Sequence, residues 1–382
     1  MNGYLVSVFQ ICRRRPNRKA AIAWFVVVCS VIFTAIATPA AVLAQTCAEG
    51  ALPGSPGRFA LSVRLENDAL GGRGQDQNYT GGTFVTVRSP NLESFTDDPC
   101  LPSTIGWLNR TFTWLQPENV DQRNMIFGVA HLAYTPSDRL RTDVIASDRP
   151  YASLLLFSLG YNGRNGAQLK ATQLRVGWVG PVTQGERVQN WYHDSLGLKR
   201  FQGWNNQLRN EVLVQGVHER LYRWSTSGSR QGWGTDFISH WGGALGNLAT
   251  HANAGAEWRV GWRLPDDFGT ASLRPAGDNL APGGTSARSS GDPAGKVSGW
   301  EGHLFASVDV RAVLHDISLD GNTFKSSHNI AKRPWVSDFG FGFAVRAGSW
   351  KLVVARNLRT REFSGQKDPS AYGGLTLVRD IP

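Results

Sequence analysis

Charged side chains are scarce in this chain. Only 18% of its 382 residues are Asp, Glu, Lys or Arg, and it has just four Cys and two Met, whereas 10% of the residues are aromatic. This combination excludes a disordered tail protein, which would be rich in charge and poor in aromatic residues. It also argues against a coiled coil, and four cysteines are too few for a disulfide scaffold.

The short motifs of several common enzyme classes are missing as well. The sequence contains no Gly-x-Ser-x-Gly, no His-Glu-x-x-His and no Gly-Lys-Ser or Gly-Lys-Thr. The formal net charge of +10 would suit a nucleic-acid partner, but beyond residues 13–19 the basic residues are scattered and form no basic cluster. We therefore expect no nucleic-acid partner.

The first 44 residues have the features of a secretory signal peptide. Residues 20–37 are apolar apart from Ser30 and Thr34. Val42 and Ala44 are the small residues expected at the third and first positions before cleavage between Ala44 and Gln45. The preceding residues include five basic ones and no acidic one: Arg13, Arg14, Arg15, Arg18 and Lys19. We predict a signal peptide over residues 1–44. The alternative is a retained signal anchor, because the apolar run reaches the lower limit of a membrane-spanning helix.

Cleavage would change both the charge and the cysteine content. Loss of the five basic residues lowers the formal net charge from +10 to +5. Only Cys47 and Cys100 would remain, and in an oxidising compartment they could form one disulfide.

The rest of the chain consists of short segments in which polar and apolar residues alternate. No further long apolar run follows, so we expect no other membrane-spanning helix. Alternation with period two indicates β-strands with one polar and one apolar face. The segments lie at residues 58–68, 82–89, 125–134, 153–161, 168–179, 209–222, 236–247, 253–264, 300–314, 336–347, 350–358 and 372–379.

Two architectures fit such strands after a signal peptide: a periplasmic β-sandwich and an outer-membrane β-barrel. A barrel carries aromatic residues at its strand ends, where they meet the membrane interfaces. Many tryptophans lie at or near segment ends: Trp178, Trp224, Trp241, Trp258, Trp262, Trp300, Trp335 and Trp350. We therefore predict an all-β protein, a transmembrane antiparallel β-barrel of twelve strands with a short helix near the active site.

This barrel would form a single domain over residues 45–382 in the bacterial outer membrane. Residues 265–299 are rich in Pro, Gly and Ser and show no periodicity. So long an irregular connection is unusual in a compact soluble domain, and we predict a long external loop.

One group of polar residues joins Glu66, Asn67 and Asp68 to residues 76–82. Carboxylate and amide oxygens clustered across one hairpin can bind a hard cation such as calcium. The alternative is ordinary turn chemistry, because Asn, Asp and Gly favour tight turns for backbone reasons.

Two further groups could carry chemistry. Apolar residues at helical spacing predict a short helix over residues 187–197, which would project His193, with Asp194 beside it. Histidine is the usual general base, although a single His is more often structural. In the third group, Asp148 and Arg149 would pair and fix the start of a strand.

Several stretches, taken together and in order, match the pattern of one family. They are residues 65–68, 78–82, 148–152, 188–193, 203–208, 243–247 with Thr250, and 360–363. On these stretches the chain resembles the outer-membrane lipid A 3′-O-deacylase (LpxR-type) family, over residues 58–379. The resemblance implies a twelve-stranded barrel and an esterase that removes the 3′-O-linked acyloxyacyl chain from the lipid A of lipopolysaccharide.

The same resemblance assigns roles to individual residues. His193 would be the catalytic base, as in phospholipase A2, Asn67 and Asp68 an essential pair, and Thr80 a required hydroxyl. His193 would take a proton from water, which then attacks the ester carbonyl. The site would lie inside the barrel near its outer rim, in a protein that we expect to be a monomer.

The resemblance also implies calcium as a cofactor. Its ligands would be Asp68, Glu66 and Asp194, and backbone N–H groups at Gly81 and Gly82 would help to stabilise the oxyanion.

This sequence departs from the family pattern in two places. Lys199 stands where some members carry a Glu; if that Glu binds the metal, Asp194, Glu211 or Glu66 must replace it, or the use of metal differs. The chain also ends in Pro382, where barrels of this class end in an aromatic residue. The alternative function is therefore a barrel without catalytic activity that binds lipid or has a structural role.

Overall fold

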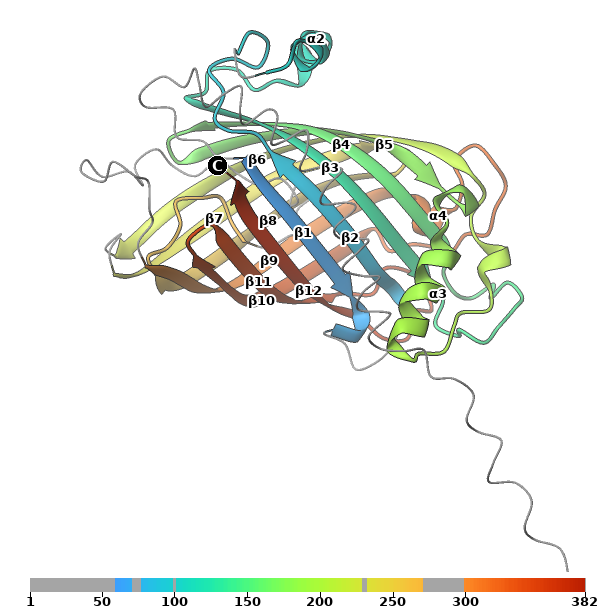
Figure 1. Ribbon diagram of the computed structural model, residues 1–382. Coiled ribbons are helices and arrows are strands. Elements are labelled where there is room, and N and C mark those ends of the chain that lie inside the picture. Colours follow the sequence, from blue (N-terminus) through green and yellow to red (C-terminus); the bar gives the residue numbers. More distant parts are fainter. Residues whose placement is uncertain (1–58, 71–76, 99–100, 229–231, 271–298, 382) are drawn as a thin grey trace, which may run out of the picture.

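The computed structural model describes residues 59–70, 77–98, 101–228, 232–270 and 299–381, and these form one closed antiparallel β-barrel (Figure 1). Each strand pairs with its neighbours in sequence, and β1 closes the barrel against β12. The predicted signal peptide, Cys47 and Cys100 lie outside the described residues. None of the described helices is long and apolar enough to span a membrane.

The twelve strands of the described chain are β1 Phe59–Asn67, β2 Asn78–Arg88, β3 Gln122–Thr135, β4 Ala152–Asn165, β5 Gln168–Val179, β6 Glu211–Gly228, β7 Trp233–Gly246, β8 Ala249–Trp262, β9 Trp300–Asp316, β10 Trp335–Ala347, β11 Trp350–Arg359 and β12 Ser370–Ile381. The helices are α2 Ser103–Thr111, α3 Gly185–Leu196 and α4 Ile317–Asp320, with 3₁₀ turns η1 Asp68–Leu70, η2 Thr113–Leu115, η3 Pro181–Thr183 and η4 Trp204–Asn206. Each predicted segment overlaps one strand, so the prediction of a twelve-stranded barrel is confirmed.

The barrel is apolar outside and polar inside. Along β10, Phe339, Phe341 and Phe343 point outward and are 41–47% exposed, whereas Asp338 on the alternate face is fully buried. Other strands place further buried polar side chains at their inward positions, among them Asn124, Asn162, Gln173, Glu219, Asp309 and Asn357. Soluble proteins bury apolar side chains and expose polar ones, and the reverse arrangement seen here is typical of a β-barrel whose outer surface faces lipid.

Exposed tryptophans lie near both ends of the barrel. Trp178 and Trp335 lie at the end that carries α3, which we call the α3 end. Trp233, Trp300 and Trp350 lie at the opposite end, called the terminal end because β1 begins and β12 finishes there. Two bands of exposed tryptophan are expected where a barrel crosses both membrane interfaces.

The connections at the two ends differ in what they carry (Figure 1). The α3 end carries α3, α4 and the other described connections that follow odd-numbered strands, and the terminal end carries α2 and residues 263–270. Of the predicted external loop, residues 271–298 lie outside the described residues, and residues 265–270 lie at the opposite end of the barrel from α3.

Residues 78–82 are part of strand β2, although the sequence had suggested a turn for residues 76–82. They pair with β3, and a register shift between Tyr79 and Gly81 marks a β-bulge. Asn78 starts the strand with φ of 69°, a conformation that Asn tolerates better than most residues. The bulge bends the strand at the α3 end, where the candidate site lies.

Candidate functional site

Four residues form a continuous row on the outside of the barrel at the α3 end. Asn67 pairs with Gly81, Gly81 with Ala133, and Ala133 with Ser153. Directly paired residues share one face of a sheet, and residues two apart on a strand share it too. Ser153 therefore lies on the same face as Phe157, which is 47% exposed on the outer wall. We call these four residues the outer row.

The loop before α3 is fixed directly to this wall. Thr183 Oγ1 donates a hydrogen bond of 2.8 Å to Ser153 Oγ, and His131 Nε2 lies 3.1 Å from the Thr183 carbonyl oxygen and 3.2 Å from Ser153 Oγ. At the start of the helix, a Cβ added to Gly185 would lie 2.2 Å from Ser153 Cβ. A glycine is thus required here for the helix to approach the strand. α3 packs on β3 and β4 from outside the barrel.

His193 lies on the buried face of α3. Gly185, Gln189 and His193 recur at a spacing of four residues, which places them on one side of a helix, and all three are buried. Val188 and Trp191 fall on another side and are 43% and 36% exposed. The helix therefore turns its histidine toward the protein and two apolar side chains away from it.

The end of α3 fixes the orientation of the histidine ring. Gly197 adopts φ of 70°, and the N–H of Leu198 then bonds to the His193 carbonyl at 2.8 Å, a helix-ending turn that favours glycine. This turn brings the Lys199 carbonyl oxygen to 2.6 Å from His193 Nδ1. Because a carbonyl only accepts hydrogen bonds, Nδ1 carries the proton, and Nε2 is the basic nitrogen of the neutral ring.

A chain of contacts places this helix over the outer row. The His193 ring packs edge-on against Phe201, with 5.5 Å between ring centroids. Phe201 belongs to a buried cluster with Tyr151 and Trp204, and Ala133 of the outer row packs against that cluster. The candidate site therefore lies between α3 and the outer wall. The sequence had placed these residues inside the barrel, whereas Asn67 and the wall under α3 face outward.

Lys199 acts here through its backbone. Its side chain is exposed, and its carbonyl group is the partner of His193. Asp194, by contrast, binds Arg200: Arg200 Nε donates to Asp194 Oδ1 at 2.8 Å. This hydrogen bond lowers the pKa of the Asp194 carboxyl.

The carboxylates predicted as calcium ligands have separate surroundings. Glu66 faces the lumen, where Tyr79 Oη donates to Oε2 at 2.7 Å and Arg64 Nε lies 3.3 Å from Oε1. Asp68 is buried in η1, and its Oδ2 accepts from the Gln77 N–H at 2.7 Å. Within the described ranges no group of three or more His, Cys, Asp or Glu residues could hold a metal ion. The predicted set therefore does not fit one calcium site, because Glu66 lies on the other side of the wall from Asn67 and Asp194 binds Arg200.

The remaining predicted residues lie close to Asn67. The Asn67 side-chain amide donates to the Thr80 carbonyl at 2.9 Å, and Thr80 Oγ1 lies 2.6 Å from Thr135 Oγ1. A Cβ on Gly81 would lie 3.3 Å from the Asn67 amide nitrogen, whereas one on Gly82 would clash with the Tyr79 hydroxyl on the inner side. Only Gly81 belongs to the outer row, and an oxyanion role for Gly81 and Gly82 stays a prediction.

The sequence had suggested that Asp148 and Arg149 pair, but their side chains do not bind each other. Asp148 Oδ2 accepts from the Ser137 N–H at 2.8 Å, whereas Arg149 donates to Glu362 at 3.3 Å and to Ser318 at 2.8 Å. Arg149 is fully buried, so this contact ties residues 148–152 to residues 360–363 across the α3 end. Each of the two stretches carries one acidic and one basic residue, so their charges alone did not indicate this contact.

Comparison with known proteins agrees with this architecture. The family model described as "Outer membrane protein LpxR" matches residues 26–381. The chain belongs to the LpxR family. Its barrel is similar to the solved structure of LpxR from Salmonella typhimurium, with a TM-score of 0.64 and 18% identity over 84% of this chain and 100% of that one. This LpxR family member is accordingly a protein of the bacterial outer membrane.

Two further solved barrels match with lower TM-scores. The β domain of the Bordetella autotransporter BrkA gives a TM-score of 0.38 at 8% identity, covering 85% of this chain and 99% of that one. The translocator domain of NalP from Neisseria meningitidis gives 0.36 at 11% identity, covering 92% of this chain and 98% of that one. No curated protein matches the LpxR-family chain.

Replacing Glu362 by Gln should lower the free energy of unfolding by about 3 kcal/mol, because it leaves the buried Arg149 without this carboxylate partner. The measurement is denaturant unfolding in detergent micelles, followed by tryptophan fluorescence. Asp97→Asn is the control, since Asp97 and its partner Arg110 are largely exposed and such pairs contribute about 0–1 kcal/mol. Equal effects of the two substitutions would contradict the structural role of the Arg149–Glu362 contact.

Proposed function

We propose that this protein is an outer-membrane esterase that hydrolyses the 3′-O-linked acyl chain of lipid A. The observation that carries the proposal is His193, buried on α3 against the outer wall with its Nδ1 bound to a carbonyl group. In a histidine held in this way Nε2 is the basic nitrogen, the atom that a general base uses. Membership of the LpxR family supports the substrate class.

The position of the site suits a substrate that stays in the membrane. A lipid in the bilayer can reach the outer wall laterally, without entering the lumen. Around α3, Val182, Val188 and Trp191 are 52%, 43% and 36% exposed, and Trp178 at the nearby end of β5 is 39% exposed. These side chains continue the lipid-facing surface of the barrel onto α3, where acyl chains would lie.

The reaction follows from the placement of His193. Its Nε2 takes a proton from a water molecule while the water oxygen attacks the ester carbonyl. The Lys199 carbonyl stabilises the imidazolium by accepting the Nδ1 hydrogen bond. The ring then returns the proton to the leaving lipid oxygen as the carbon–oxygen bond breaks, giving a free fatty acid and a lipid alcohol.

The residues in and next to the outer row have supporting roles in this proposal. In it, the Asn67 amide holds the bulge of β2 through the Thr80 carbonyl, and Gly81, which has no side chain, lets the ester group lie beside Asn67. Backbone N–H groups at Gly81 and Gly82 would stabilise the negative oxygen of the tetrahedral intermediate. Asp68 follows Asn67 directly and supports the turn of η1 through Gln77.

His193→Ala should lower the rate of acyl release by about 100-fold or more, the usual contribution of a general base. Mass spectrometry of lipid A, from cells that express each variant, measures the release. His218→Ala is the matched control, because His218 lies on β6, exposed and bonded to Thr172. An unchanged lipid A profile on expression of the wild-type protein would contradict the esterase and favour a barrel that only binds lipid.

Lys199→Ala should leave the deacylase rate close to that of the wild-type protein. The reason is that the substitution keeps the carbonyl group that binds His193 Nδ1. The measurement is the same lipid A assay, with equal amounts of folded barrel. A loss as large as that of His193→Ala would instead assign a catalytic role to the Lys199 side chain.

The calcium requirement implied by the family stays a prediction, and none of the steps above depends on it. Chelation with EDTA should lower acyl release by the purified protein, and added calcium should restore it, because a bound cation would stabilise the oxyanion. Magnesium at the same concentration is the control. Full activity in EDTA would exclude calcium as a cofactor but leave the His193 mechanism intact.

A further inference from the structure

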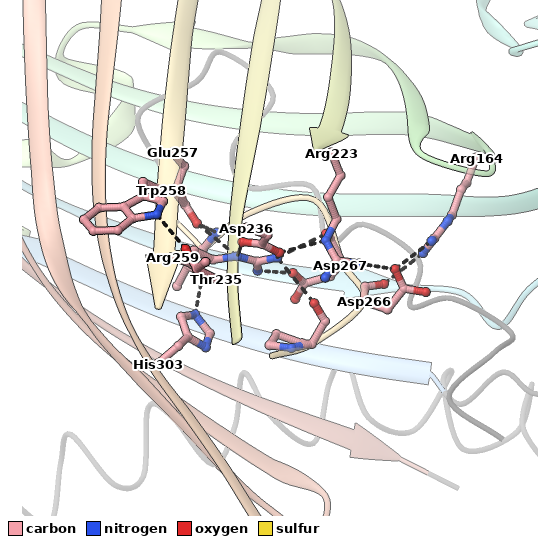
Figure 2. A network of polar contacts seen from close by, with 12 residues as sticks. Arg164, Arg223, Thr235, Asp236, Glu257, Trp258, Arg259, Asp266, Asp267 and His303 are labelled. Carbon is pink, nitrogen blue, oxygen red and sulfur yellow. Dashed lines mark hydrogen bonds and ion pairs between the residues drawn. The ribbon is translucent and has the colours of Figure 1, made fainter. Parts of the chain in front are cut away.

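Buried charges cluster in the lumen toward the terminal end (Figure 2). The strands supply four cations that reach this cluster: Arg164 from β4, Arg223 from β6, Arg259 from β8 and Lys351 from β11. In the same contacts the strands supply only two carboxylates, Asp236 from β7 and Glu257 from β8. A buried charge is costly unless an opposite charge is close.

The missing negative charges come from the segment after β8. Asp266 Oδ1 lies 2.8 Å from Arg164 Nη2 and also contacts Arg223 Nη1. Asp267 contacts Arg259 Nη1, and its Oδ2 lies 3.4 Å from Lys351 Nζ. With these two residues the cluster has four cations and four carboxylates. The strands are therefore built with a positive excess that this segment neutralises.

The same segment is also anchored by apolar and neutral contacts. Phe268 is fully buried against Leu169, Leu221 and Ile238. The Thr270 N–H donates to Glu257 Oε1 at 2.7 Å, and Thr270 Oγ1 lies 2.7 Å from His303 Nε2.

We propose that residues 265–270 are an internal plug that closes the lumen to ions and small solutes at the terminal end. The plug bonds to side chains of β4, β6, β8, β9 and β11, which lie on different sides of a closed barrel, so it crosses the lumen. Without such a segment, the polar interior of a barrel holds a water-filled path. The plug is at the opposite end from α3, so this inference does not depend on the esterase.

The charge balance predicts what the loss of the two aspartates would do. Replacing Asp266 and Asp267 by Asn leaves four lumenal cations facing two carboxylates, and removes the ion pairs that hold the plug. The barrel should then conduct ions, with a preference for anions. The wild-type barrel should not conduct.

The test is single-channel recording of the full-length protein, purified after export, in planar lipid bilayers. We expect no conductance from the wild-type barrel and discrete conductance steps from D266N/D267N. In a KCl gradient, the reversal potential of these steps should have the sign that indicates selectivity for anions. D97N/D143N is the matched control, since it removes the same charge from two exposed ion pairs and should stay silent. Heat-modifiable gel mobility verifies that each variant is folded.

Two results would overturn the plug: conductance of the wild-type barrel, or a folded D266N/D267N barrel as silent as the control. If D266N/D267N does not fold, Phe268→Ala replaces it, because it removes the apolar anchor and keeps every charge. A folded and silent Phe268→Ala barrel would then contradict the plug. A cation preference in D266N/D267N would overturn the charge balance.

Discussion

Successive side chains along a strand point alternately into the lumen and out of the barrel, and this alternation decides on which side of the wall each functional residue acts. Glu66 and Asn67 are neighbours in sequence, yet Glu66 bonds to Tyr79 and Arg64 in the lumen while Asn67 pairs with Gly81 on the outer row. A shift of one residue in the register of β1 would exchange the two. Because α3 packs on the outer face, only the outward residues of β1 to β4 can share a site with His193.

The sequence predicted the strands and the helix that carries His193 well, since both depend on local patterns. Period-two alternation, tryptophans at segment ends and the helical spacing of apolar residues such as Val188 and Trp191 are visible without a structure, although these two side chains face away from the protein and are exposed. The side of the barrel wall on which the site lies was harder to predict. The alternation along β1 does not show on which face α3, more than a hundred residues further along the chain, will pack. The site was therefore expected in the lumen.

Other features depend on connections that only the closed barrel defines. Residues 265–270 lie at the terminal end because they follow the eighth strand, and their own composition does not show this. The Arg149–Glu362 contact joins residues 213 positions apart, and no spacing rule indicates it. The same holds for the balance between Asp266, Asp267 and the arginines of β4, β6 and β8. Burial forces these charges to find partners, but their choice of partner is a property of the folded barrel.

The central claim is that the ester is cleaved on the outer wall, between α3 and the outer row. The most direct measurement is a crystal structure of the protein with a lipid A analogue whose 3′ ester is replaced by a non-hydrolysable amide. We predict that the amide carbonyl lies beside His193 and Gly81, with the acyl chain along the outer face of β2 to β4. Density for the amide in the lumen, beside Glu66 and Arg64, would contradict this claim.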